Sequence, residues 1–201
     1  MYHLYYTLES SAMGCHAALE ETGADFVLHR VNTTRKRTRD YLSLNPLGKV
    51  PSLIDERGDG ERLILYQSGA ILLYLAEKTG RFIPGDLRGR AEVLQWLFWQ
   101  MGSAPFLGGG FGHFYAYAPE KYEYPINRYA MEVKRQLDVL DRRLADNRYM
   151  CGDEYTIADM AIWPWYGALV ANKVYDAAEF LEAHTYTNVV RWMEEIAHRP
   201  A

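Results

Sequence analysis

The chain has 201 residues, 49% of them hydrophobic, a formal net charge of −4 and a pI of about 5.9. This acidic balance gives no electrostatic support for a nucleic-acid partner, because proteins that bind nucleic acid usually show a basic domain or stripe, so we expect none. No stretch approaches the roughly 18 apolar residues that a membrane span needs. The first residues, MYHLYYTLES, lack the basic segment and apolar core of a signal peptide. We therefore expect a cytoplasmic protein with no membrane partner.

Cysteine and histidine usage argues against a metal centre. The two cysteines, Cys15 and Cys151, are far apart, and the six histidines show no metal-ligand spacing. Both thiols are expected to be reduced in the cytoplasm, because disulfides are rare there. Cys15 falls inside a predicted helix, where a small buried core residue is the expected role rather than a reactive thiol.

The first part of the chain predicts a strand, a helix and a second strand. Residues 3–7 are aromatic and weakly alternating, residues 12–22 are followed by a capping Gly23, and residues 26–31 favour a strand. A strand–helix–strand unit forms a right-handed parallel crossover.

A hairpin and a helix are predicted next. Val50-Pro51 opens a short strand at residues 52–54, residues 57–60 (RGDG) form the hairpin loop, and residues 62–66 return as a strand. A helix then begins at Gln67-Ser68. These elements together predict a thioredoxin-like α/β domain over residues 1–80.

The second part of the chain predicts helices only. A linker over residues 81–87 contains Pro84-Gly85, and an all-helical domain is expected over residues 88–201. Its expected helices cover residues 88–101, about 125–145, 156–173 and 187–197. Residues 102–112 hold five glycines and a proline, which predict a bend or loop. Thr156 and Asp159 have the spacing of a capping box.

The hairpin and the helix that follows it together suggest a ligand site. A helix N-terminus at Ser68 carries free backbone N–H groups that can hold a carboxylate. A cis Val50-Pro51 bond would turn the backbone N–H and C=O of Val50 outward, where they can pair with an extended peptide. This combination would suit a small acidic peptide.

The residues of this stretch also resemble a known family. Lys49-Val50-Pro51 followed by residues 66–71 (YQSGAI) resembles the glutathione-site signature of the cytosolic glutathione transferases. Residues 94–102 (LQWLFWQMG) and 156–159 (TIAD) resemble the bacterial nu type, whereas the N-terminal loop is closer to the bacterial beta type. The resemblance covers essentially the whole chain. It implies the transferase architecture, glutathione as co-substrate and a homodimer.

The resemblance also implies which residues bind glutathione. Ser68 would hold the γ-glutamyl carboxylate and Gln67 its ammonium, while Val50 and Pro51 would supply the docking backbone. Lys36 falls near a side chain that contacts the glycine carboxylate in this family, and Lys49 is a second candidate for that contact.

Ser11 and Ser10 are the candidate catalytic residues. When the loop is aligned on the beta type, Ser11 takes the place of its cysteine and Ser10 the place before it. A free thiol has a pKa near 8.5, and a hydroxyl donor beside a helix N-terminus would favour the thiolate. The alternative is that one serine merely caps the first helix, with Thr7 as a third candidate. Glu9 departs from the family pattern: it either faces solvent or opposes thiolate formation.

Residues 102–117 are expected to form the wall of a co-substrate pocket, with Phe106, Phe111, His113 and Tyr115 as lining residues and the glycines providing mobility. A dimer contact is the alternative role for this stretch. The nature of the acceptor does not follow from these residues.

The sequence thus predicts a glutathione-dependent transferase that activates the thiol for attack on an electrophile, as in detoxification, or on a disulfide. Some transferases of the nu type act as glutathione-dependent disulfide reductases, so the resemblance of Trp99–Gly102 to that type favours disulfide exchange over conjugation. A non-catalytic binding protein with the transferase fold is the third possibility.

Overall fold

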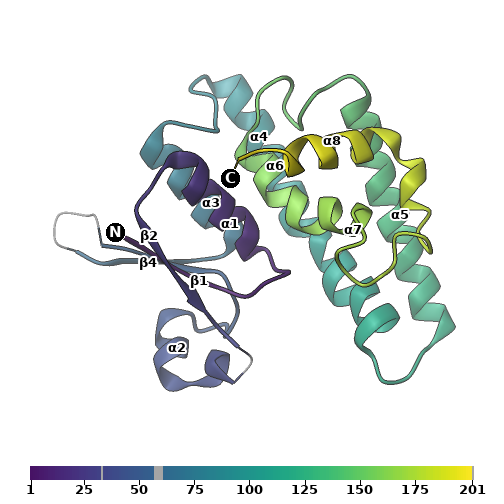
Figure 1. The fold of residues 1–201 in the computed structure, drawn as a ribbon, viewed down its shortest axis with the longest axis horizontal. Helices are drawn as coiled ribbons and strands as arrows, with labels where there is room; N and C mark the ends of the chain where they lie inside the picture. The colour runs from purple at the N-terminus through teal and green to yellow at the C-terminus, as the bar shows by residue number, and fades with distance from the viewer. Residues whose placement is uncertain (33, 57–60, 201) are drawn as a thin grey trace. The chain divides into compact units, whose positions relative to one another are not determined.

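The computed structural model describes residues 1–32, 34–56 and 61–200. The chain divides into two compact units, Met1–Ile83 and Pro84–Pro200. The first is an α/β unit of the thioredoxin type and the second is helical, so the predicted fold class is confirmed (Figure 1). The hairpin loop predicted at residues 57–60 lies outside the described residues.

A four-stranded mixed sheet organises the first unit. Its elements are β1 (Tyr2–Tyr6), α1 (Ala12–Thr22), β2 (Phe26–Arg30), η1 (Arg35–Arg37), α2 (Arg39–Leu44), β3 (Ser52–Asp55), β4 (Leu63–Tyr66) and α3 (Ser68–Thr79). The strand order is β2-β1-β3-β4, with β1 parallel to β2 and antiparallel to β3. Helix α1 ends where predicted, since Gly23 adopts φ 65° and its N–H bonds to the Glu20 carbonyl at 2.9 Å.

The two faces of the sheet pack against different helices. Successive strand residues face opposite ways, so paired residues share a face. Leu4 pairs with Leu53 and both are fully buried, on the face that α1 and α3 cover side by side (Figure 1). Tyr5 and Ile54 face the other way and form a second core with Tyr41 of α2.

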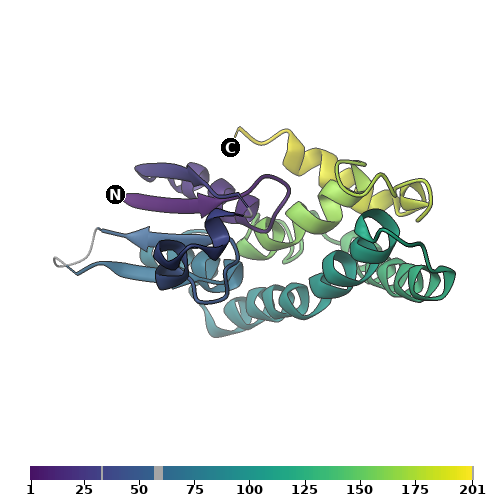
Figure 2. The same cartoon turned by 90° about the horizontal axis from the view of Figure 1, so that it is seen from below.

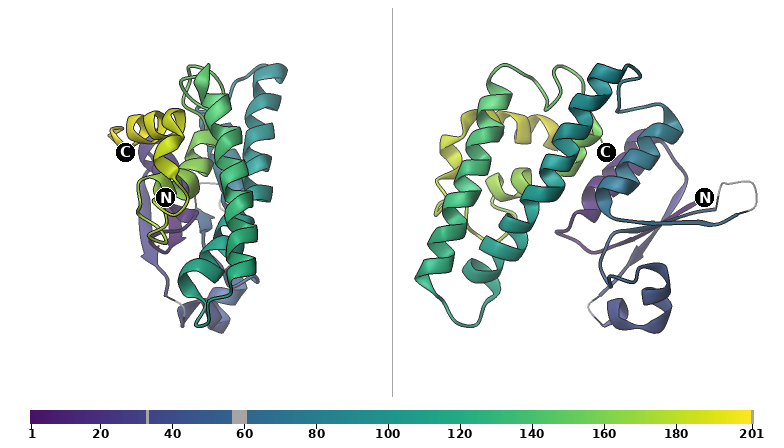
Figure 3. Two further views of the ribbon diagram at one scale, coloured as in Figure 1. Left: turned by 90° about the vertical axis from the view of Figure 1, so that its right-hand side faces the viewer. Right: turned by 180° about the vertical axis from the view of Figure 1, so that it is seen from behind.

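The second unit is built on two long helices. Its elements are α4 (Leu87–Pro105), the π-helix η2 (Phe106–Tyr117), α5 (Glu123–Ala145), α6 (Ile157–Ile162), the π-helix η3 (Trp163–Gly167), α7 (Ala168–Val170), η4 (Ala183–Thr185) and α8 (Thr187–Ala197). Helix α5 packs against η2, which continues α4 (Figures 2 and 3), and α6 packs against α4 with every one of its residues buried. Within the described ranges, no helix is both long enough and apolar enough to cross a lipid bilayer.

The expected bend at residues 102–112 is wrong, because the chain stays helical through α4 and η2. Three of the five glycines, Gly108, Gly110 and Gly112, serve packing instead. A Cβ on Gly108 would come within 2.5 Å of the Trp165 ring, and one on Gly110 within 2.5 Å of the Tyr129 ring. Aromatic rings that pack directly against the glycine backbone therefore compensate for the poor helix propensity of glycine.

The capping box predicted at the start of α6 is confirmed. The Thr156 hydroxyl accepts a hydrogen bond from the Ala158 N–H at 3.3 Å, and the Asp159 carboxylate accepts one from the Thr156 N–H at 3.0 Å. The same carboxylate accepts a bond from the Met150 N–H at 2.9 Å. Asp159 thus joins the start of α6 to the loop before it.

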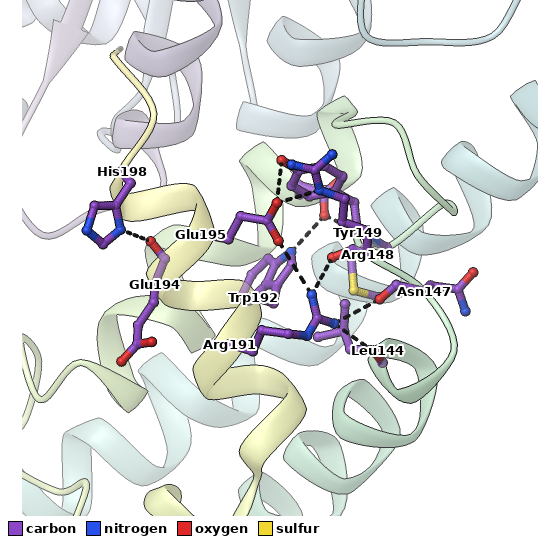
Figure 4. Close-up of polar contacts among 11 residues, drawn as sticks. Leu144, Asn147, Arg148, Tyr149, Arg191, Trp192, Glu194, Glu195 and His198 are labelled. Atoms are coloured by element: carbon purple, nitrogen blue, oxygen red, sulfur yellow. Dashed lines mark hydrogen bonds and ion pairs between the residues drawn. The ribbon is translucent and has the colours of Figure 1, made fainter.

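Helix α8 is fastened to the end of α5 by arginines (Figure 4). The Arg191 guanidinium donates to the Leu144 carbonyl at 2.8 Å, which satisfies a free carbonyl in the last turn of α5, and to the Asn147 carbonyl just after that helix at 2.9 Å. Arg148 donates to Glu195 of α8 at 2.5 Å. These contacts hold the C-terminal helix α8 against the end of α5 and the loop that follows it.

Candidate functional site

Sheet register brings the predicted site segments to one edge of the first unit. Tyr5 pairs with Ser52, and Ser52 pairs with Tyr66, so the end of β1, the start of β3 and the end of β4 are neighbours. The parallel pairing of Tyr6 with Arg30 adds the end of β2 to this edge. The loops that hold Ser10-Ser11, Val50-Pro51, Gln67-Ser68 and Lys36 therefore all leave the sheet on the same side.

The N-terminus of α3 has the features of a carboxylate site. The first helical bond runs from the Ile71 N–H to the Gln67 carbonyl, so the N–H groups of the first turn before Ile71 have no helical partner. Ser68 is 7% exposed, and its hydroxyl has no hydrogen bond among the described residues. Gln67 is exposed and adopts φ 74°, an unusual conformation for a residue with a side chain. A hydroxyl and free N–H groups thus converge at this helix end.

The backbone of Val50, just before β3, has, within the described residues, the unpaired polar groups that an extended peptide ligand needs; we call residues 50–52 the docking strand. The Val50-Pro51 bond is cis, as predicted. In the part of the chain that the structure describes, neither the N–H nor the C=O of Val50 makes a hydrogen bond. Pro51 itself is buried, and β3 begins directly after it. One donor and one acceptor are thus available to an extended ligand.

The two serines before α1 differ in what they bond. The Ser10 hydroxyl donates to the Thr7 carbonyl at 2.6 Å and accepts from the Ala12 N–H at 3.3 Å. The Ser11 hydroxyl has no partner among the described residues, although Ser11 is the N-cap residue of α1. The Thr7 hydroxyl donates to the Val31 carbonyl at 2.7 Å. Of these three hydroxyls, only that of Ser11 is uncommitted.

Glu9 is exposed and has φ 54°, which is the left-handed region that glycine adopts without cost. This conformation gives a physical reason why a glycine would suit the position. Of the two alternatives raised by the sequence, the exposure of Glu9 agrees with a side chain in solvent.

Neither cysteine has the properties of a nucleophile. Cys15 is fully buried, its sulfur lies 3.7 Å from the Ser68 carbonyl, and burial raises its pKa far above the ordinary value. Burial also raises the pKa of Cys151 to about 12, with the nearby Asp159 charge acting in the same direction. Both thiols therefore stay protonated at neutral pH.

The two lysines of the predicted site are on different loops. Lys36 is half-buried in η1, and its carbonyl lies 3.2 Å from where a Cβ on Gly48 would be. The basic turn is therefore packed against the approach to Val50. Lys49 is exposed. Either ammonium is available for a carboxylate, since no ion pair involves them among the described residues.

The expected co-substrate wall is only partly accessible. Phe111 is fully buried, with its ring 4.9 Å from Tyr115 and 6.1 Å from Phe180, so its assignment to a pocket wall is corrected to the core of the helical unit. Phe106 is 43% exposed, His113 is exposed and Tyr115 is half-buried. These three stay candidates for contact with an acceptor.

Sequence reasoning missed a buried polar cluster next to the docking strand. Tyr41 and Asn45 are 2% and 1% exposed, and both donate hydrogen bonds to the Lys49 carbonyl. The only signal in the sequence is Asn45 ahead of Pro46 and Gly48, residue types that indicate a turn and no more. No group of three or more metal-ligating side chains occurs in residues 1–32, 34–56 and 61–200.

Comparisons with known proteins agree on one family. Residues 1–77 match the glutathione S-transferase N-terminal domain, and residues 123–195 match the glutathione S-transferase C-terminal domain. The disulfide-bond oxidoreductase YfcG of Escherichia coli is 38% identical over 206 residues, which cover 100% of this chain and 92% of the relative.

Two further relatives are more similar in sequence. The disulfide-bond oxidoreductase YghU of Escherichia coli is 54% identical over 186 residues, covering 92% of this chain but only 64% of the relative. The chain thus spans less than two thirds of the length of that relative. The crystal structure of the glutathione transferase YghU from Streptococcus pneumoniae, complexed with glutathione, has a TM-score of 0.94 and 49% identity, and covers 99% of this chain and 79% of that one. The chain belongs to the glutathione S-transferase family.

Proposed function

We propose that this protein is an enzyme that binds glutathione on the first unit and uses its thiol mainly for thiol–disulfide exchange. One observation carries the proposal: three uncommitted polar groups lie along a single sheet edge. They are the Ser68 hydroxyl with the N-terminus of α3, the Val50 backbone and the Ser11 hydroxyl.

Each group suits one part of the tripeptide. Ser68 and the α3 N-terminus would hold the γ-glutamyl carboxylate, while Gln67 would accept from the ammonium. The N–H and C=O of Val50 would pair with the cysteinyl backbone. Pro51 would fix the direction of the chain where β3 begins. Lys36 or Lys49 would meet the glycine carboxylate as a point charge.

Ser11 would then act on the sulfur. A hydroxyl that donates to the sulfur stabilises the thiolate more than the thiol, which lowers the pKa of the bound thiol. The N-terminus of α1 adds a partial positive charge to the same place. Ser10 is the weaker candidate, because its hydroxyl proton already bonds to the Thr7 carbonyl.

The exchange reaction balances without a protein cysteine. The glutathione thiolate attacks one sulfur of a disulfide, forms a mixed disulfide and expels the other sulfur as a thiolate, which takes up a proton. A second glutathione thiolate then attacks the glutathione sulfur of the mixed disulfide. This step forms glutathione disulfide and releases the remaining substrate thiol. Two glutathione molecules are thereby oxidised and one disulfide is reduced.

The names of two relatives favour exchange as the main reaction, and the burial of both protein cysteines bears on its mechanism. Cys15 and Cys151 are held protonated by burial, so the thiolate available at neutral pH would be that of glutathione. Relatives that are 54% and 38% identical are named disulfide-bond oxidoreductases.

Conjugation to an electrophile is the second candidate, since it needs the same activated sulfur. The exposed aromatic side chains of η2 favour it: Phe106 is 43% exposed and Tyr117 is 68% exposed. Such surfaces suit small hydrophobic acceptors, as in detoxification. A cytoplasmic homodimer completes the proposal, and sedimentation should give twice the 23.2 kDa mass of the chain.

Three measurements separate the candidates: retention on immobilised glutathione, turnover of hydroxyethyl disulfide and turnover of a chloronitrobenzene. We expect retention and a faster disulfide reaction. Retention without either turnover would instead indicate a non-catalytic binding protein. Cys151→Ser and Cys15→Ala should keep the disulfide activity, and loss of that activity in a folded cysteine variant would contradict the mechanism.

A further inference from the structure

A buried polar cluster controls the direction of the peptide unit that precedes the docking strand. The Tyr41 hydroxyl donates to the Lys49 carbonyl at 2.7 Å, and Asn45 Nδ2 donates to the same oxygen at 2.8 Å. Both acceptor positions of this carbonyl are therefore occupied from the protein interior.

The donors are themselves held in place. Asn45 Oδ1 accepts the Leu47 N–H at 3.0 Å, and Asn45 Nδ2 also approaches the Ser52 Oγ at 3.3 Å. The Ser52 Oγ lies 3.1 Å from the Tyr41 hydroxyl, which closes the cluster. The side chains involved are at most 2% exposed, so water cannot replace these bonds.

Because a peptide unit is planar, the hydrogen bonds that fix the Lys49 carbonyl also fix the direction of the Val50 N–H. The Lys49–Val50 bond is trans, and in a planar trans peptide the N–H points opposite to the C=O. Because the Lys49 C=O is held toward the buried Tyr41 and Asn45, the Val50 N–H must face away from them. That N–H is the donor with no partner among the described residues.

We propose that Tyr41 and Asn45 are positioning residues, which hold the Lys49 carbonyl so that the Val50 N–H is presented to the backbone of a bound peptide thiol. This inference rests on the proposed glutathione site. It assigns part of the affinity for glutathione to two side chains that would never touch it. Pre-set orientation raises affinity because no free energy is spent on ordering the donor at the moment of binding.

Two variants and one matched control test the role. Tyr41→Phe removes one donor and keeps the ring in the core. Asn45→Asp keeps the oxygen that accepts the Leu47 N–H, but replaces the donor with an oxygen that repels the Lys49 carbonyl. The control is Tyr74→Phe, which also removes a tyrosine hydroxyl bonded inside the first unit, at 2.5 Å from Asp55, but on the other face of the sheet.

The first readout needs no ligand. In crystal structures of the unliganded variants, the Lys49–Val50 peptide plane should rotate in Asn45→Asp and stay in place in Tyr74→Phe. An unrotated plane in both Asn45→Asp and Tyr41→Phe overturns the inference. If the wild-type protein fails to bind glutathione while the peptide plane rotates as expected, the proposed function is wrong, but Tyr41 and Asn45 still orient the Val50 N–H.

The second readout is glutathione affinity by calorimetry. We expect Tyr41→Phe to raise the Kd several-fold and Asn45→Asp to raise it about tenfold or more, where tenfold corresponds to about 1.4 kcal/mol. Tyr74→Phe should leave the Kd unchanged, even if it lowers the melting temperature by as much as Tyr41→Phe does. At saturating glutathione, Tyr41→Phe should keep kcat and the thiol pKa of wild type, because the Ser11 loop is a separate segment. An equal rise in Kd for Tyr74→Phe would show a merely structural effect.

Discussion

The indole Nε1 of Trp192 donates a hydrogen bond to Oδ1 of Asp159 at 2.9 Å, and both side chains are fully buried. This bond ties α8 to the capping box of α6. Asp159 therefore serves three segments at once: its own helix start, the Met150 loop and the C-terminal helix.

Asp159→Ala should destabilise the protein more than a lost helix cap does. Removing the carboxylate leaves buried donors of Met150, Thr156 and Trp192 without an acceptor, at about 1–3 kcal/mol for each group. Thr156→Ala loses the cap and one hydroxyl donor to Asp159 but leaves the carboxylate in place, and it should cost about 1 kcal/mol. Urea unfolding of both variants checks the order, and equal losses would contradict the three-segment role. The glutathione Kd should stay near the wild-type value in both.

Gly110→Ala should destabilise the helical unit, although alanine normally favours a helix. Its Cβ would come within 2.5 Å of the Tyr129 ring, and overpacking of this kind costs about 1–3 kcal/mol. Gly109→Ala is the matched control in the same π-helix, since no atom lies within 4 Å of its Cβ position. That variant should be neutral or more stable by up to about 1 kcal/mol. The denaturant midpoints of the two variants, measured side by side, test this prediction. A Gly110→Ala variant as stable as wild type would contradict the packing of the Tyr129 ring on the Gly110 backbone.

Ser11→Ala should raise the thiol pKa of bound glutathione by about one unit, or 1.36 kcal/mol. Binding should survive, because the carboxylates would be held by other segments. Thiolate absorbance near 240 nm, followed against pH, measures the shift. Ser10→Ala is the control, and a shift in Ser10→Ala alone would transfer the role to the neighbour.

Ser68→Ala should weaken glutathione binding without moving that thiol pKa. A lost charge-assisted hydrogen bond is worth about 1.5–3 kcal/mol, which is roughly ten- to a hundredfold in Kd. Calorimetry at constant pH measures the change. Unchanged affinity would remove Ser68 from the site.

Acid should destabilise the first unit through His29. Burial, together with the charges of His3 and Arg35, lowers its pKa below the ordinary value of 6.5. Its Nε2 lies 3.0 Å from His3 Nδ1, its ring stacks on Tyr5, and Glu56 pairs with the far side of His3. Below pH 6.5 the unfolded chain binds a proton that the folded chain resists, so stability should fall as pH drops from 6.5 through the folded-state pKa.

His29→Gln removes this titration. The free energy of unfolding, measured in urea between pH 5 and pH 8, should then depend less on pH than it does in wild type. Parallel curves for the two proteins would exclude His29 as the source.

The amino-acid sequence by itself determined the order of the elements and the local chemistry at their ends. Hydrophobic periodicity and capping residues act within a few positions, so α1, α8, the Gly23 cap and the Thr156 capping box follow from short stretches. The same holds for the helix start at Ser68, because Gln67-Ser68 directly precedes a helical apolar pattern.

Tertiary structure decided whatever depends on partners distant in the chain. Rings from Trp165 and Tyr129 occupy the space that side chains at Gly108 and Gly110 of η2 would take. Phe111 belongs to the core because its ring packs against Tyr115 and Phe180. Tyr41 and Asn45 gained their importance only when folding brought both donors to one carbonyl, an arrangement that no spacing in the sequence indicates.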